Sequence, residues 1–200
     1  MSEQTTKDLK KDIYLMLHKA LEMLELIEDG FVKNKVSALD QAEDLAKDIQ
    51  TREDHLTGAL AKIAASNPEA RNILAVPAHI EKIAYNLRRL NDGIRTKNKE
   101  ALLFSDKAIQ ETGSLFTKAK DVLKKAGDAT VSSNTALADT VKADAEALVR
   151  MADGYATSHE DRLVAGECSP KASSTYLCIL YSFEDVVSHA KEVVKKLTAK

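Results

Sequence analysis

The sequence contains few of the residues that shape turns and β-structure. Among its 200 residues it has no Trp, only 4% aromatic residues, seven Gly and three Pro. Gly and Pro therefore contribute ten residues, where an average protein of this length has about 24. β-Sandwiches and β-barrels need many tight turns between short strands, so this composition excludes them.

Charge of one sign and long apolar runs are also missing. The 29 Lys and Arg residues nearly balance the 31 Asp and Glu residues, which gives a net charge of −2 and a pI of about 6.2. A general nucleic-acid-binding domain would carry a basic stripe or a pI above about 9. The longest stretch without a charged residue covers 12 residues, from Ala172 to Phe183, whereas a membrane span needs about 20. We therefore expect no nucleic acid as a partner and no insertion into a membrane.

The N-terminal segment and the cysteines favour a cytoplasmic protein. The first 12 residues are polar and carry charges of both signs, so they lack the apolar region of a secretory signal peptide. The two cysteines, Cys168 and Cys178, are too few for a disulfide framework and do not form a Cys-x-x-Cys pair. Reduced thiols of this kind are typical of the cytosol.

Apolar residues recur at the spacing of amphipathic helices along almost the whole chain. Ala alone accounts for 28 residues, and Ala is the strongest helix former. The pattern predicts six helices, which cover about residues 9–31, 36–63, 68–94, 101–126, 137–163 and 170–197. Pro77 predicts a kink or break inside the third helix, and Gly127 predicts the end of the fourth.

Capping residues mark several of these helix ends. Asn67-Pro68 and Ser169-Pro170 each combine a good N-cap residue with a proline at the first helical position, where its missing N–H is not needed. Gly166 is expected to end the fifth helix in a left-handed conformation, and Ser169 is expected to cap the sixth.

Helices of this length must lie side by side, so we predict an all-α fold of two antiparallel three-helix bundles placed side by side. The third and sixth helices share their Pro-capped start, and Ile80-Glu81 in one matches Phe183-Glu184 in the other. This similarity suggests a duplication, with residues 1–95 and 96–200 as two repeats of one compact domain. The predicted core takes one residue from each helix: Leu24, Ile49, Ile80, Leu115, Leu148 and Phe183.

The sequence has no motif of a common enzyme class. It contains no GxGxxG, GxxxxGK[ST], GxSxG or HExxH pattern. A di-metal carboxylate enzyme on a helical bundle would need Glu-x-x-His pairs. None of the five histidines has an acidic residue three positions before it, and none lies three or four residues from another histidine. We therefore expect no catalytic residues and no enzyme activity.

One long segment, HEDRLVAGECSPKASSTYLCILYSFEDVVSHA, runs from His159 to Ala190. Its distinctive residues are His159, Arg162-Leu163, Gly166 to Pro170, Glu184 and His189-Ala190. This arrangement resembles the PhoU family of bacterial and archaeal phosphate-uptake regulators, especially the PhoU-like domain of sodium–phosphate cotransporters. The segment from Leu102 to Glu111 is similar to the start of that family's second repeat, and His79 to Leu87 stands in the place of the first motif. The resemblance covers nearly the whole chain.

The resemblance also bears on metal binding. Family members hold clusters of iron or other metals through pairs of carboxylates four residues apart, and the resemblance places Glu81 and Glu184 at such positions. The second member of each pair is replaced, by Tyr85 and by Ser188. One carboxylate per motif is too few for a multinuclear site. We expect that the family metal clusters are lost, that no cofactor is bound, and that Glu81 and Glu184 are exposed or paired with Lys or Arg.

The resemblance implies a regulatory protein that modulates phosphate transport or phosphate signalling through protein–protein contacts. Its partner would be a phosphate transporter or a sensor protein, met in the cytoplasm at the inner membrane, and a homodimer is compatible with this function. The motif residues would be partner-facing or structural: His159, Arg162, Gly166, Pro170 and His189. The alternative is a helical scaffold or interaction protein without a phosphate role, which the residues alone do not separate from the first function.

Overall fold

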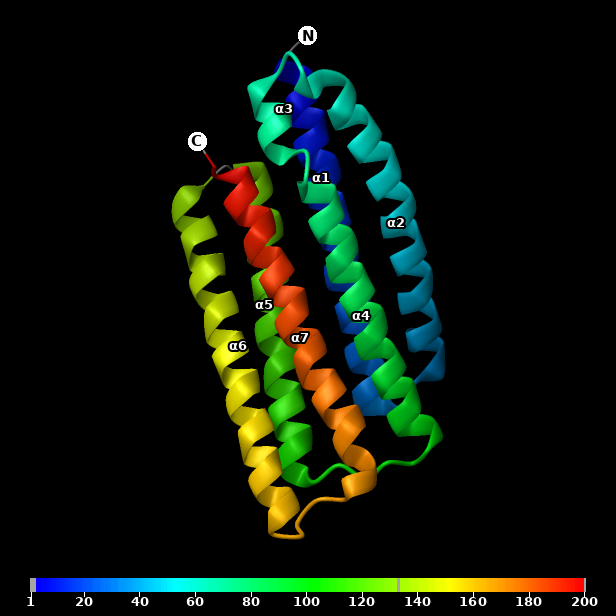
Figure 1. The fold of residues 1–200 in the computed structure, drawn as a ribbon. Helices are drawn as coiled ribbons and strands as arrows, with labels where there is room; N and C mark the ends of the chain where they lie inside the picture. Colours follow the sequence, from blue (N-terminus) through cyan, green and yellow to red (C-terminus); the bar gives the residue numbers. More distant parts are fainter. Residues whose placement is uncertain (1–2, 133, 200) are drawn as a thin grey trace.

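The long amphipathic segments form long helices in the computed structural model, which describes residues 3–132 and 134–199, with side chains from residue 7 onwards. This part of the chain contains no strand, and its seven helices are α1 (Glu3–Lys33), α2 (Val36–Ala64), α3 (Pro68–Ile73), α4 (Val76–Lys99), α5 (Asp106–Ser132), α6 (Thr135–Val164) and α7 (Pro170–Leu197). The long helices lie along a common direction and give the molecule an elongated shape (Figure 1). None of the described helices is long and apolar enough to span a bilayer.

The helices form two three-membered groups. α1, α2 and α4 pack against one another, and α5, α6 and α7 do the same. The two groups stand side by side because α4 packs along α7 and α1 along α5 (Figure 1). The all-α fold of two three-helix bundles is therefore confirmed. The boundary expected between residues 95 and 96 falls inside α4, and the duplication stays a prediction.

One continuous core of buried apolar side chains runs through all seven helices. The six residues predicted for the core are all fully buried, with 0% of their surface exposed: Leu24, Ile49, Ile80, Leu115, Leu148 and Phe183. The ring of Phe116 lies 5.7 Å from that of Phe31 and 4.9 Å from that of Phe183. Because these rings belong to α1, α5 and α7, aromatic packing crosses from one bundle to the other.

Pro68 and Pro77 lie at the beginnings of helices, as the sequence predicts. The third helix is broken before Pro77, which lies in the first turn of α4, and the short α3 precedes it. This break raises the number of described helices from six to seven. Asn67 caps α3 as predicted, because its side-chain oxygen accepts a hydrogen bond of 3.1 Å from the N–H of Ala70.

Two predicted boundaries around α5 are wrong. Gly127 does not end the helix, which continues beyond it to Ser132; its buried position in the bundle offsets the poor helix propensity of glycine. The helix also begins at Asp106 rather than at residue 101, because α4 runs on to Lys99 and Ala101 then turns the chain with a φ of 49°.

Candidate functional site

The predicted site residues lie in two separate places. The first group lies on α4 and α7, which pack along each other, and contains Glu81 of α4 and Glu184 and His189 of α7. The second group lies where α6 ends and α7 begins and contains His159, Arg162, Gly166 and Pro170.

The first place holds a pair of histidines. His79 on α4 and His189 on α7 are half-buried, with their Nδ1 atoms 3.3 Å apart and their ring centroids 5.6 Å apart. At this separation one Nδ1–H donates to the other Nδ1, so the neutral pair consists of two different tautomers. His189 is among the predicted site residues and His79 is not, although His79 opens the segment that stands in place of the first family motif.

Burial lowers the pKa of both histidines. For His79 the charge of Glu192 opposes this effect, while Lys196 and Lys195 add to it. For His189 the neighbouring His79 adds to the lowering, as does Lys82, and Asp185 and Glu192 oppose it. Two imidazolium ions at this distance would repel each other. The contact therefore belongs to the neutral state of the pair, and acid will disrupt it.

Glu184 differs from expectation, because it is neither exposed nor paired. It is half-buried on α7, and its Oε1 atom is buried without a hydrogen-bond partner. Burial, followed by the negative charges of Asp153 and Asp185, raises the pKa of Glu184 to about 7. Lys191, which lies two helical turns after Glu184 on α7, is 3.6 Å from Glu146 on α6. The carboxyl group of Glu184 therefore changes charge close to neutral pH.

Glu81, unlike Glu184, is paired with a basic residue as expected. Its carboxylate is 30% exposed and lies 3.8 Å from the ammonium group of Lys82. Arg88, which lies two helical turns after Glu81 on α4, pairs with Glu43 of α2 at 2.7 Å. Basic side chains thus bind the remaining carboxylates of this interface, and Arg89 likewise lies 2.9 Å from Asp185.

At the second place, where α6 ends and α7 begins, polar side chains form a buried cluster. The guanidinium of Arg162 on α6 donates two hydrogen bonds, of 3.0 and 2.8 Å, to the carboxylate of Glu111 on α5. The hydroxyl of Tyr176 on α7 donates a third to the same carboxylate. Glu111 is only 2% exposed, so this bidentate pair fixes three helices to one another in a low-dielectric environment.

Protonation in this cluster follows from the same contacts. Burial and the hydrogen bond to Glu111 raise the pKa of Tyr176 far above its ordinary value, so it stays a donor. Burial disfavours the charged form of Arg162 and lowers its pKa. The Glu111 carboxylate has the larger, opposite effect, so the pKa of Arg162 rises. Burial and the charge of Arg162 lower the pKa of His159. His159 Nε2 lies 2.9 Å from the hydroxyl oxygen of Ser173 on α7.

Glu111 is the member of this cluster that the sequence analysis missed. A signal was present, because Glu111 lies between Ala108 and Leu115 on the buried stripe of α5. A carboxylate at a core position is rare unless it is paired.

The turn between α6 and α7 is a Schellman motif. Gly166 has a φ of 73° as predicted, its N–H donates to Leu163 O, and the N–H of Glu167 donates to Arg162 O. Ser169 occupies the N-cap position of α7, but its side chain makes no capping hydrogen bond, so the predicted hydroxyl cap is wrong. Pro170 follows at the first helical position. Gly166 and Pro170 thus shape this turn, and whether the motif residues also face a partner stays a prediction.

The fold is that of two solved structures. The crystal structure of the phosphate transport system regulatory protein PhoU from Streptococcus pneumoniae has a TM-score of 0.85 at 11% identity, with 96% of this chain and 92% of that chain covered. The crystal structure of PhoU from Pseudomonas aeruginosa has a TM-score of 0.77 at 16% identity, with 98% and 97% covered. No protein-family model and no curated protein matches the sequence. The resemblance inferred from the motif is therefore confirmed at the level of the fold.

Proposed function

We propose that this chain is a PhoU-like regulatory protein that modulates phosphate transport or phosphate signalling through protein–protein contacts. The observation that carries the proposal is the agreement of fold over almost the full length of both chains in both comparisons. The motif between His159 and Ala190 supports it independently, because it was identified in the sequence without reference to the fold.

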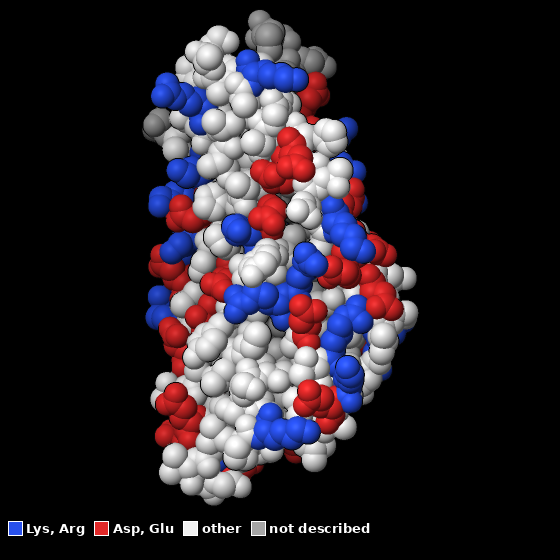
Figure 2. Space-filling model, turned by 45° about the vertical axis from the view of Figure 1, so that its right-hand side comes forward, with Lys and Arg blue, Asp and Glu red and all other residues white. Residues whose placement is uncertain are grey.

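The proposed activity is binding without catalysis. In the buried polar cluster, Arg162 and Tyr176 both donate to Glu111. We infer that this network joins α5, α6 and α7 and does not act on a substrate. Lys and Arg alternate with Asp and Glu over the surface seen in Figure 2, without a large area of one sign. A mixed surface of this kind suits a specific protein partner better than nucleic acid.

We propose further that the regulator works without a multinuclear metal cluster. Among the residues that the structure describes, no group of three or more His, Cys, Asp and Glu side chains could hold a metal ion. Glu184 lies near Asp153 and Asp185, but the latter is bound to Arg89. Glu81 lies beside Lys82. Hard cations need several converging oxygen ligands, and these carboxylates do not fit that requirement.

The partner we propose is a phosphate transporter or a phosphate-sensing signalling protein, met on the cytoplasmic side of the inner membrane. The test is a deletion of the gene in its own host, followed by measurement of phosphate uptake and of a phosphate-starvation reporter. We expect uptake or reporter expression to become insensitive to phosphate supply, and expression of the intact chain to restore the response.

A binding experiment completes the test. The tagged chain is expressed in its host and recovered after chemical cross-linking, with the buried-cluster variant Arg162→Met as a fold-weakened control. Recovery of a phosphate transporter subunit or of a phosphate-sensing protein by the intact chain supports the proposal. Normal phosphate responses in the deletion strain, together with recovery of neither partner, would contradict it and favour a helical scaffold without a phosphate role.

A further inference from the structure

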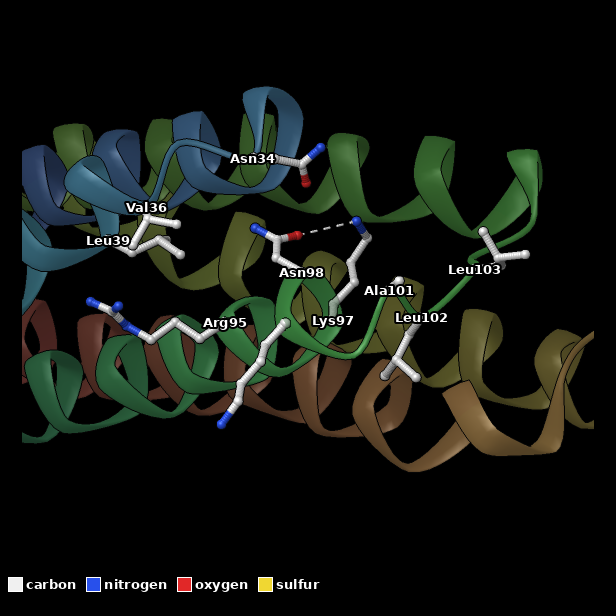
Figure 3. Close-up of a pocket in the computed structure, with 10 residues that line it drawn as sticks. Asn34, Val36, Leu39, Arg95, Lys97, Asn98, Ala101, Leu102 and Leu103 are labelled. Atoms are coloured by element: carbon white, nitrogen blue, oxygen red, sulfur yellow. Dashed lines mark hydrogen bonds between the residues drawn. The ribbon is translucent and has the colours of Figure 1, made fainter.

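A cavity of about 830 Å³ lies outside both groups of predicted site residues. It opens where α4 ends, beside the connection between α1 and α2 and the beginning of the loop that leads to α5 (Figure 3). Cavities of roughly 300–1,000 Å³ are the usual size of sites for small organic ligands.

Apolar side chains line much of this cavity. They come from the start of α2 and from the loop after α4: Val36, Leu39, Ala101, Leu102 and Leu103. Leu103 is 83% exposed and Val36 is 57% exposed. Apolar surface of this kind gains free energy when a ligand removes it from water.

Every charged residue that lines the cavity is basic: Arg95, Lys97 and Lys99. Arg95 already pairs with Asp40 at 2.7 Å. Lys97 has no carboxylate partner among the described residues. Its ammonium group instead lies 5.3 and 5.7 Å from the ring centroids of Phe31 and Phe104.

The environment of Lys97 favours a bound anion. It is half-buried, and burial lowers its pKa. Among the described residues, the one hydrogen bond of its ammonium group is long, 3.4 Å, and goes to the side-chain oxygen of Asn98, a neutral group (Figure 3). A cation removed from water without a counter-charge is costly, so an anion placed in the cavity beside Lys97 would be stabilised.

The backbone around the cavity is unusual. Among the described residues, the non-glycine positions with a positive φ are Asn34 at 52° and Ala101 at 49°, and both line this cavity. Both residues closely follow a helix end, Asn34 after α1 and Ala101 after α4, and a left-handed residue is the common C-terminal cap of a helix. This conformation still costs an alanine about 1 kcal/mol or more.

We propose that this cavity binds a small organic anion in which a carboxylate or phosphate group is attached to an apolar body. Lys97 contacts the anionic group, and the exposed side chains of Val36 and Leu103 contact the apolar part. Inorganic phosphate lacks that part and is not the ligand. The site goes beyond the regulatory function proposed above and does not depend on it.

The experiment is a titration of the intact protein with decanoate and with decyl phosphate, followed by calorimetry and by backbone amide NMR. We expect both to bind with one site per chain, and the shifted amides to fall in residues 34–39 and 95–103. Decyltrimethylammonium, which has the same tail and the opposite charge, should bind at least tenfold more weakly, and inorganic phosphate should produce no shifts in these segments.

Three variants separate the site from general detergent binding. Lys97→Met keeps the length of the side chain and removes its charge, and it should weaken decanoate binding by about tenfold or more, as expected for a charged hydrogen bond. Leu103→Ser changes an exposed loop residue and should weaken binding without affecting the fold. Lys124→Met, an exposed lysine of α5 outside the cavity, is the matched control and should bind like the wild type.

Several results would overturn the proposal. Equal binding of decanoate and decyltrimethylammonium, shifts scattered over the whole bundle, or unchanged affinity in both Lys97→Met and Leu103→Ser would each do so. Binding to phosphatidylglycerol vesicles without binding of decanoate would also contradict it, because the ligand would then be a membrane surface and not a free molecule.

Discussion

Replacing Glu184 by Gln should stabilise the protein at alkaline pH and have little pH-dependent effect in acid. The carboxyl group is half-buried with an unpartnered Oε1, and burial and the nearby Asp153 and Asp185 raise its pKa from 4.5 to about 7. A displacement of this size corresponds to about 3 kcal/mol at 1.36 kcal/mol per pKa unit. This free-energy cost applies to the ionised carboxylate of Glu184 in the folded protein.

The pH window follows from proton binding by the two states. Below pH 4.5 the carboxyl is protonated in both, and it contributes no difference. Between 4.5 and about 7 the folded protein keeps a proton that the unfolded chain has lost, so the stability of the wild type falls as the pH rises. Above that range the full penalty of about 3 kcal/mol applies to the wild type, while Glu184→Gln escapes it.

The assay is urea unfolding followed by circular dichroism, for wild type and variant, at about pH 4 and about pH 8.5. At each pH we take the difference in the free energy of unfolding between variant and wild type, and we then compare this difference at the two pH values. Any pH-independent cost of the buried amide cancels in this comparison. We expect the variant to gain about 3 kcal/mol relative to the wild type on going to the higher pH. Glu146→Gln, on an exposed carboxylate of α6, is the control and should show no such gain. A pH-independent difference for Glu184→Gln, or a loss at high pH, would mean that the carboxylate is stabilised by a partner such as a bound cation.

Four other variants test the remaining contacts. Gly166→Ala should lower the free energy of unfolding by about 1 kcal/mol, and Ala101→Gly should raise it by up to about 1 kcal/mol, because both residues lie in left-handed backbone; equal effects of the same sign in urea unfolding would contradict this. Arg162→Met should cost roughly 3–5 kcal/mol, because it leaves a buried carboxylate without its cation, and a loss below 1 kcal/mol in the same assay would argue against the buried pair. Protonation of His189 should contribute a loss of stability as the pH falls from 6.5 through its lowered pKa, so the stability of His189→Leu relative to the wild type should rise over this range.

The sequence predicts the architecture well because the signals for it are local. Helical periodicity, the Asn67 cap and the glycine at position 166 each depend on a few neighbouring residues, and each appears in the structure as predicted. The errors near α5 have a different cause. Gly127 and residues 101–105 have their conformation set by packing and by the end of α4, which short-range patterns do not contain.

The site could be predicted only in part, because its contacts join distant segments. Glu111 meets Arg162 across 51 positions, and His79 meets His189 across 110. A single sequence identifies residue types but not such pairings. The prediction for Glu184 failed for the same reason: Lys191, two helical turns further along α7, pairs with Glu146 of α6, and the described residues leave Oε1 of Glu184 without a hydrogen-bond partner.

The continuous core also determines how the molecule comes apart. Since the buried side chains of both bundles belong to one cluster, and Phe116 bridges to both Phe31 and Phe183, neither half can open without exposing apolar surface of the other. We therefore expect the chain to unfold as a single cooperative unit, with the slowest-exchanging amides of α1, α4, α5 and α7 reporting the same opening free energy. A destabilising change at one end of the bundle, such as the loss of Arg162, is then transmitted to every helix as a shift of one common equilibrium.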